Sequence, residues 1–398
     1  MEKLYKTWAE IDLGAVRENI AAIRSRLGRA VKLLAVVKAD AYGHGMIQIS
    51  RAALEAGVSW LGVSNICEAL TLRKSFPGAR ILILSAGMAG HAGAIVRHRI
   101  TPVICSHEML DAVSRAALKA KRIVDIHIVV DTGMGRIGVW HEGAFDFIKR
   151  ARRTKGVRLR GICSHFACAA ERDLFFTKLQ LDRFKRLILR CERAGIRFAL
   201  KHIANSGAIL GLPSSSLNLV RLGIMMYGVY PSQEVIKSIP IRPALTLKTE
   251  ICFLKNVRKG RSISYCRSYV TYRDTRVATI PIGYGDGYSR LLSNRGEVLV
   301  RGQRAPVIGN VTMDQTMIDV GHISGAQVGD EVVLIGRQGE NEITLNEVAD
   351  LTGTIPYDVM CAMGKQVQHR IYIQDKIQTS KSKPPHKLKI IIPKSKTI

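Results

Sequence analysis

Side chains that could carry chemistry stand directly after several short apolar runs of this 398-residue chain. Lys38 follows the run LLAVV. A lysine in that position can form a Schiff base with an aldehyde once burial lowers its pKa, because only the neutral amine attacks. Other apolar runs lead to polar residues of further types, namely Asp131, Arg136, His165, Ser206 and Arg221. Together they predict one shared basin rather than unrelated surface positions.

The elements that must position these residues follow from the spacing of the apolar runs. From residue 30 onward, β-branched runs alternate with amphipathic stretches that expose lysine and arginine, which indicates alternating strands and helices. The eight expected strands cover residues 31–37, 60–63, 81–84, 102–105, 123–130, 157–163, 198–203 and 217–221. Eight such units predict a (β/α)8 barrel, in which the carboxyl ends of all strands form the active-site face.

The sequence changes in character near residue 240. Strand-like runs without long helices follow, interrupted by one expected helix at 345–351 that Gly353 would end. We therefore expect an α/β fold, with a (β/α)8 TIM-like barrel over residues 1–240 and a mostly-β C-terminal domain over 241–375. Residues 376–398 hold seven lysines and no acid, which predicts a basic, disordered tail.

The net charge of +28 is the one unusual bulk property and raises the question of a nucleic-acid or membrane partner. The basic residues are spread out, without the aromatic interleaving typical of RNA-binding modules. No stretch reaches the roughly 18 apolar residues of a membrane span, and acids near the N-terminus do not fit a signal peptide. The eight cysteines form no CxxC pair or regular spacing, which predicts neither a metal site nor disulfides. We expect a cytoplasmic protein without a specific nucleic-acid or membrane partner.

One aldehyde cofactor suits this predicted site, namely pyridoxal 5'-phosphate. Its aldehyde would join Lys38. Its phosphate would bind at the turns after the seventh and eighth strands, where barrels often bind phosphate. Ser206, Gly223 and Ile224 stand in those turns.

The segment AVVKADAYGHG resembles the pyridoxal-phosphate lysine motif of the alanine racemase family. Further segments resemble motifs of that family in the same order, namely TWAEIDLGAVRENI, VDTGMGRIG, RLGIMMYGVYP, SISYCRSYVT, IPIGYGDGY, GNVTMDQTMIDV and TGTIPYDV. The similarity runs from about Thr7 to Met360 and covers both expected domains. It implies an amino acid racemase that interconverts L- and D-alanine.

The resemblance implies a two-base mechanism. Lys38 would abstract or return the Cα proton on one face of the substrate, and Tyr265 would act on the opposite face. A phenol has an ordinary pKa of about 10 and needs support as a base at neutral pH. The supporting residues of the family match His165 and Arg221. Because a guanidinium keeps its proton, Arg221 facing the pyridine nitrogen would favour racemisation over transamination.

Other family positions match residues that bind substrate and cofactor. Arg136 would bind the substrate carboxylate together with the backbone N–H of Met313. The expected cofactor-binding residues are Lys38, Tyr42, Ser206, Arg221, Gly223, Ile224 and Tyr357. The resemblance also implies a homodimer with composite active sites, since in this family Tyr265 and Met313 reach the site from the other subunit.

The sequence departs from the family pattern in several places. Val129 replaces a lysine that many members carry as a carbamate, so Arg136 must be held by something else, such as a bound anion or a neighbouring side chain. Cys266 replaces a glycine after the catalytic tyrosine, which constrains the loop if a positive φ is needed. GKQVQHR replaces a basic, proline-containing run, and the lysine-rich tail has no family counterpart. We expect His44 and His202 to be structural.

Other functions fit the sequence less well. A related barrel-type decarboxylase would place an acidic residue at the pyridine nitrogen, where this chain has Arg221. Single-domain barrels that regulate pyridoxal phosphate supply lack a second domain, and a nucleic-acid-binding protein is supported by charge alone. The substrate stays open between alanine, serine and basic amino acids, because one sequence does not reveal the lining of a side-chain pocket.

Overall fold

The computed structural model describes residues 7–367 and 369–374, which fall into two compact units. The barrel unit consists of Arg17–Ala41 and Met46–Ile241. Of the described residues, the β unit combines 7–16, the short segment Tyr42–Gly45 and those from 242 to 374. The tail expected over residues 376–398 lies outside the described residues.

Eight parallel strands form the centre of the barrel unit. Their bounds are β2 (Lys32–Val36), β3 (Trp60–Val63), β4 (Ile81–Ile83), β5 (Thr101–Ile104), β6 (Val124–Asp131), β8 (Val157–Cys163), β9 (Leu200–His202) and β10 (Leu219–Leu222). They are hydrogen-bonded in the order β10-β2-β3-β4-β5-β6-β8-β9, with the short β7 (Val139–Trp140) beside β6. The N–H of Arg221 donates to the carbonyl of Ala204 (3.1 Å), so the two ends of the sheet adjoin in a nearly closed barrel. The predicted fold class and all eight predicted strands are confirmed.

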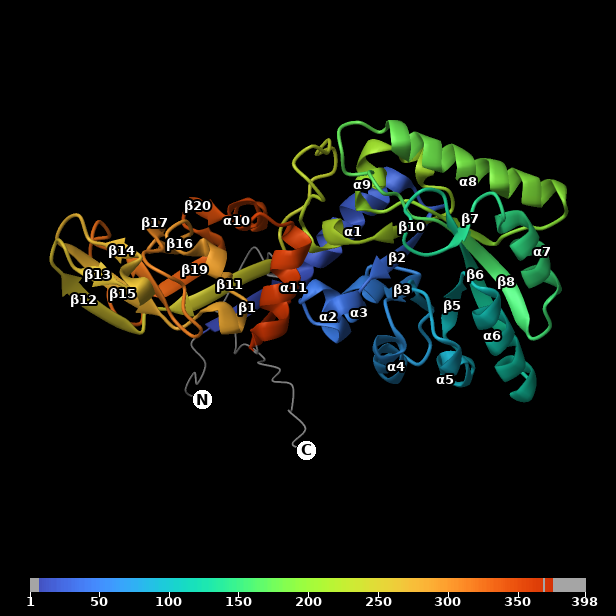
Figure 1. Ribbon diagram of the computed structural model, residues 1–398, viewed down its shortest axis with the longest axis horizontal. Coiled ribbons are helices and arrows are strands. Elements are labelled where there is room, and N and C mark those ends of the chain that lie inside the picture. The colour runs from blue at the N-terminus through green and yellow to red at the C-terminus, as the bar shows by residue number, and fades with distance from the viewer. Residues whose placement is uncertain (1–6, 368, 375–398) are drawn as a thin grey trace, which may run out of the picture. The chain divides into compact units, whose positions relative to one another are not determined.

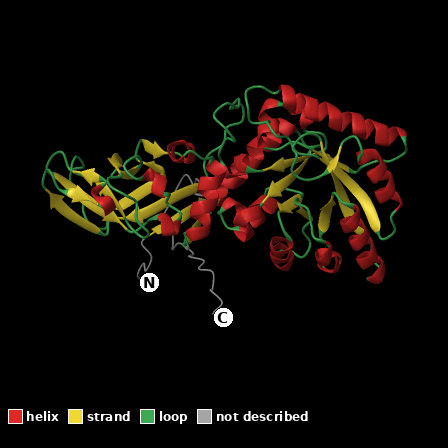
Figure 2. Cartoon of the chain, viewed as in Figure 1, coloured by secondary structure: helices red, strands yellow, loops and turns green. Residues whose placement is uncertain are grey.

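Helices surround these strands (Figures 1 and 2). They are α1 (Leu13–Leu27), α3 (Met46–Glu55), α4 (Ile66–Ser75), α5 (Ala92–Arg97), α6 (His107–Lys119), α7 (Ala144–Arg153), α8 (Phe175–Arg193) and α9 (Ser206–Gly211). Side-chain caps begin three of them, because Asn65, Ser106 and Asn205 each accept an N–H from the first turn. The helices α5 and α9 have only six residues each, which is too short to give an amphipathic period in the sequence. None of the described helices is long and apolar enough to cross a bilayer.

The β unit is built on a mostly antiparallel sheet in the order β17-β16-β19-β11-β1-β21. These strands are β1 (Thr7–Asp12), β11 (Leu245–Glu250), β16 (Glu297–Val300), β17 (Gln303–Pro306), β19 (Glu331–Gln338) and β21 (Arg370–Ile373). β1 pairs antiparallel with β11 and parallel with β21, so the first strand of the chain lies inside this sheet. We expected residues 1–240, which include β1, to form the barrel. In the structure β1 instead belongs to the β unit.

Smaller elements complete the β unit. A second sheet joins β12 (Phe253–Val257), β15 (Thr275–Ile280) and β18 (Thr316–Asp319), and β13 (Ser262–Ile263) pairs with β14 (Tyr269–Val270). The helix α10 (Leu345–Thr352) ends as predicted at Gly353, which is left-handed with φ 66°. It is followed by α11 (Pro356–Gln366), which the sequence analysis missed.

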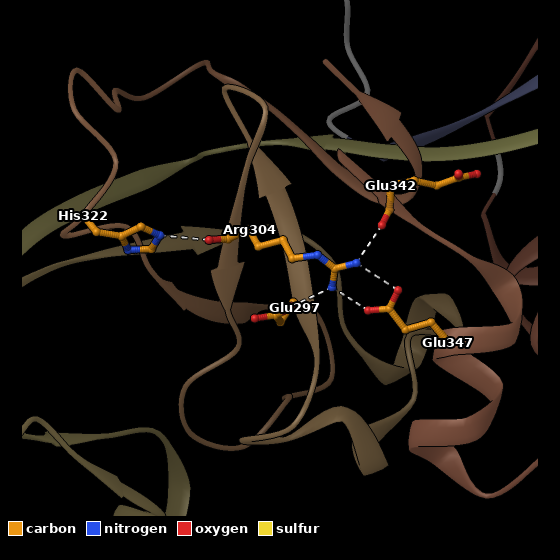
Figure 3. A network of polar contacts seen from close by, with 5 residues as sticks. All are labelled: Glu297, Arg304, His322, Glu342 and Glu347. Carbon is orange, nitrogen blue, oxygen red and sulfur yellow. Dashed lines mark hydrogen bonds and ion pairs between the residues drawn. The ribbon is translucent and has the colours of Figure 1, made fainter. Parts of the chain in front are cut away.

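An ion-pair network attaches α10 to the sheet of the β unit (Figure 3). The guanidinium of Arg304 on β17 lies 2.6 Å from the carboxylates of both Glu297 and Glu347, and it also donates to the carbonyl of Glu342 (2.7 Å). His322 donates to the carbonyl of Arg304 (2.9 Å). Because Glu347 belongs to α10, the network fixes that helix against β16 and β17.

Candidate active site

Lys38 stands at the carboxyl end of β2, at the start of a strained turn. Ala39, Asp40 and Ala41 have φ values of 53–57° and ψ values of 45–51°, a left-handed conformation that disfavours residues with a Cβ. Two carboxylates hold the turn. Glu68 accepts the N–H of Ala39, and Asp40 accepts the N–H of Met46, each at 2.7 Å. Strain of this kind persists where the surrounding structure fixes it, and it is typical of functional sites. Nothing in the sequence analysis pointed to Glu68.

Arg221 lies buried at the end of β10 and donates to two histidines. Its Nη2 lies 2.9 Å from Nδ1 of His165, and its Nη1 lies 2.8 Å from Nδ1 of His202. A guanidinium has only donors, so both Nδ1 atoms accept and both ring protons sit on Nε2. The pKa of each histidine lies well below its ordinary value. Burial is the larger cause, and the positive charge of Arg221 is the second. Both rings are therefore neutral at neutral pH.

The sequence-predicted residues of the barrel unit converge on His165. Burial is the largest cause of the lowered pKa of this histidine, and the charges of Arg221, Arg136 and Lys38 each lower it further. The ends of β2, β8 and β10 and the loop after β6 therefore face one basin, as the spacing of the apolar runs predicted.

His202 connects Arg221 to a second buried histidine that the sequence analysis did not single out. Nε2 of His202 lies 2.8 Å from Nδ1 of His127, so the His202 proton is donated onward. Burial lowers the pKa of His127 to about 3. A Cβ at position 161 would lie 2.7 Å from the His127 ring, which explains the glycine there. His202 thus lies between Arg221 and His127 and orients the Arg221 guanidinium.

We predict that His202→Leu destabilises the barrel unit by about 2–3 kcal/mol, because a buried guanidinium proton loses its acceptor. Denaturant unfolding measures this loss. His202→Asn is the matched control, since its amide can present an oxygen near the position of Nδ1, and it should recover most of the stability. If the leucine variant were as stable as the parent, Arg221 would not depend on His202.

The turns after β9 and β10 lie together. Ser206 is buried at the start of α9, and its Oγ accepts the N–H of Met225 (3.4 Å), just beyond Gly223 and Ile224. Asn205 caps α9 by accepting the N–H of Ala208 (3.1 Å). The contact between Ser206 and Met225 thus unites the two turns in which the sequence analysis placed a phosphate site.

Arg136 stands on an exposed loop that Asp131 organises. The Asp131 carboxylate accepts the N–H groups of Gly133, Met134 and Gly135 at 2.8–2.9 Å, which fixes the loop directly before Arg136. Val129 is buried in β6. Among the described residues, none forms a hydrogen bond or ion pair with the Arg136 side chain, and Asp131 fixes only the backbone that leads into it.

Two tyrosines of the predicted set meet inside the β unit. The rings of Tyr42 and Tyr357 pack edge to face with centroids 5.9 Å apart. Burial, and then Tyr357, raises the pKa of Tyr42 far above its usual range, and burial raises the pKa of Tyr357 to about 12. Both therefore remain protonated donors. Gly43 allows this approach, because a Cβ there would lie 2.6 Å from the backbone of Gly364 on α11.

Tyr265 and Met313 lie on the surface of the β unit, with 72% and 55% of each residue exposed. The backbone before and after the Tyr265 Cα is unusual, since Ser264 and Cys266 have φ values of 65° and 58°. Cys266 thus adopts the positive φ that a glycine would favour. Asn310 supports the turn by donating to the carbonyl of Tyr265 (2.9 Å).

Comparison with known proteins identifies the family. Residues 11–231 match the alanine racemase N-terminal domain, and residues 244–372 match the alanine racemase C-terminal domain. The chain belongs to the alanine racemase family. An alanine racemase of Halothermothrix orenii is 42% identical over 361 residues, which are 91% of this chain and 95% of the relative.

Solved alanine racemases share the fold. The enzyme from a D-cycloserine-producing Streptomyces lavendulae matches with a TM-score of 0.88 and 37% identity, covering 94% of this chain and 98% of its own. The Bartonella henselae alanine racemase, solved with covalently bound pyridoxal phosphate, matches with a TM-score of 0.84 and 29% identity, covering 93% and 100%.

Proposed function

We propose that this chain is a pyridoxal-phosphate-dependent alanine racemase that interconverts L- and D-alanine. The observation that carries the proposal is the buried Arg221 bound to His165 and His202, at the same end of the barrel as Lys38. A permanently charged guanidinium suits racemisation, whereas barrel-type decarboxylases need an acidic residue at that position. The similar proteins named alanine racemase support the same function.

The residues present fit pyridoxal phosphate. Arg221 uses Nη1 and Nη2 for protein acceptors, while its Nε forms no hydrogen bond with a described residue and is the donor left for a pyridine nitrogen. The expected phosphate ligands offer hydroxyls and N–H groups, namely Tyr42, Ser206, Gly223, Ile224 and Tyr357. Lys38 would hold the cofactor covalently. When bound, the cofactor draws electron density from the substrate Cα and so makes its proton acidic.

The side chains of this protein would then move that proton. Nζ of Lys38 and the hydroxyl of Tyr265 would serve opposite faces of Cα. Because its Nδ1 is occupied by Arg221, His165 can only donate from Nε2, which suits stabilising a tyrosine oxygen that has given up its proton. Arg136 and the N–H of Met313 would bind the substrate carboxylate and fix the orientation of Cα.

A substrate assay tests this proposal. Purified protein supplied with pyridoxal phosphate should convert L-alanine to D-alanine, and serine and basic amino acids more slowly. Chiral chromatography of the products from a panel of L-amino acids measures this. A faster reaction with serine or lysine would move the protein to the alternative substrate class, and release of carbon dioxide would identify a decarboxylase.

We also propose a homodimer with composite sites, to which Tyr265 and Met313 would come from the second subunit. Their exposure on the β unit is compatible with that role. Lys38→Ala and Tyr265→Phe proteins should each be inactive, yet a refolded equimolar mixture should recover about a quarter of parental activity, since half of the dimers would hold one intact site. A mixture that stays inactive would mean that each chain builds its own site.

The proposed location is the cytoplasm. Among the described residues no two cysteines form a disulfide, which is compatible with a reducing compartment. Cell fractionation tests this assignment directly.

A further inference from the structure

A group of basic segments lies at one end of the barrel unit. Four segments lead directly into the neighbouring strands β4, β5, β6 and β8, namely residues 73–80, 97–100, 118–123 and 149–156. None of the four contains an aspartate or glutamate. Because parallel strands all begin at the same end of a barrel, these segments share one surface, which we call the basic face.

Hydrogen bonds join the four segments into a continuous surface. Arg73 donates to the carbonyls of His98 and Arg99 (2.9 Å), which links the first segment to the second. Arg122 donates to the carbonyl of Arg97 (2.9 Å), which links the second to the third. The fourth segment is tied to α6 and β6, because Ser114 donates to the carbonyl of Lys155 (2.8 Å) and Val124 to that of Gly156 (3.0 Å).

Most cations of the basic face have no acidic partner. Asp111 pairs with Arg150 and Asp146 with Lys149. Among the described residues, no ion pair involves the other exposed cations, which are Lys74, Arg80, Arg97, Arg99, Lys119, Lys121, Arg122, Arg152, Arg153 and Lys155. A concentration of like charges is unfavourable for the folded chain alone, but it attracts a polyanion.

Two large apolar side chains lie exposed among these cations. Leu118 is 52% exposed and Ile123 is 70% exposed, and Lys119, Lys121 and Arg122 stand between them in the sequence. No aromatic residue of the four segments is among the exposed large hydrophobic residues. Binding of nucleic acid would favour aromatic rings that stack on bases, whereas a bilayer surface accepts aliphatic side chains beside its charged headgroups.

We propose that the basic face docks this protein on an anionic lipid bilayer. Peripheral binding of this kind combines attraction of lysine and arginine to acidic headgroups with shallow insertion of apolar side chains. The sequence-based expectation of no membrane partner rested on the lack of a spanning segment and on basic residues that are spread along the sequence. Surface docking needs no spanning segment, and the fold brings basic residues from four separate segments to one face. Because Lys38 follows the carboxyl end of β2, the basic face lies at the opposite end of the strands and leaves the candidate active site open.

Vesicle co-sedimentation of the full-length protein tests this proposal. The probe is phosphatidylcholine vesicles with about one third phosphatidylglycerol, at an ionic strength of about 0.15 M. The test variant changes four unpaired cations of the basic face, Lys119→Glu, Lys121→Glu, Arg153→Glu and Lys155→Glu. The matched control makes the same charge change at exposed lysines elsewhere, Lys178→Glu, Lys185→Glu, Lys255→Glu and Lys259→Glu.

The parent protein should bind these vesicles and not pure phosphatidylcholine vesicles. The test variant should bind at least about tenfold more weakly, and the control should stay within about twofold of the parent. Equal losses in both variants would show that net charge rather than this face is responsible, and no binding by the parent would overturn the proposal. Unfolding temperatures check that both variants fold.

A second variant separates lipid from nucleic acid. Leu118→Ser combined with Ile123→Ser should weaken vesicle binding severalfold without altering any binding to double-stranded RNA, because only a bilayer takes up the aliphatic side chains. Unchanged vesicle binding would contradict the proposal. So would a parent protein that binds RNA through the four changed cations but does not bind vesicles.

Discussion

Lys38→Ala should abolish both covalent attachment of pyridoxal phosphate and racemisation. The strained turn after β2, held by Glu68 and Asp40, fixes the lysine backbone at the end of the barrel that also holds Arg221. Alanine keeps that turn but removes the amine, so the protein should fold and still lose activity by about ten-thousandfold or more. Absorbance near the visible edge, borohydride trapping with peptide mapping, and the alanine assay measure the three effects.

Lys32→Ala is the matched control, because Lys32 is an exposed lysine at the other end of the same strand. It should keep the cofactor and the activity. A borohydride-reducible adduct that persists on another lysine in the Lys38→Ala protein would contradict the assignment.

Tyr265→Phe should keep the cofactor and lose racemisation by at least about a hundredfold, the contribution of a positioned acid or base. The substitution removes one oxygen from an exposed side chain, and the support of the turn by Asn310 uses the backbone carbonyl, which is unchanged. The fold should therefore be unaffected.

The two enantiomers should respond unequally. If Lys38 serves the face from which D-alanine loses its proton, solvent exchange of the D-alanine Cα proton should survive better than that of L-alanine. Deuterium exchange followed by NMR distinguishes them. Tyr272→Phe removes the hydroxyl of another exposed tyrosine of the β unit and should change neither rate. Equal loss of both exchanges, or normal racemisation, would show that Tyr265 is a structural tyrosine.

The sequence alone determined the barrel and the face that carries its chemistry. A continuous β-branched apolar run is typical of a parallel strand that is buried on both faces. The polar residue that follows such a run therefore lies at the carboxyl end of the strand. The predicted strands 60–63 and 157–163 have the same bounds in the structure. Gly353 ended its helix as predicted, because a left-handed residue after a helix is a local property that glycine favours.

The tertiary structure decided which distant residues meet. Thr7 pairs with Thr249 within one sheet, so β1 belongs to the β unit although it precedes the barrel in the sequence. Tyr42 and Tyr357 pack together across more than 300 positions of the chain. Local periodicity carries no information about such pairings, because they depend on how separate elements close around a shared core.

The support of the candidate site was likewise decided by the tertiary structure. Glu68 and His127 appear in no motif of the sequence analysis, yet one holds the turn after Lys38 and the other receives the proton of His202. A buried donor needs an acceptor, and the fold supplies it from whichever neighbouring strand or helix lies within reach. Residue type and spacing revealed the groups that could do chemistry, while the closed barrel selected the residues that orient them.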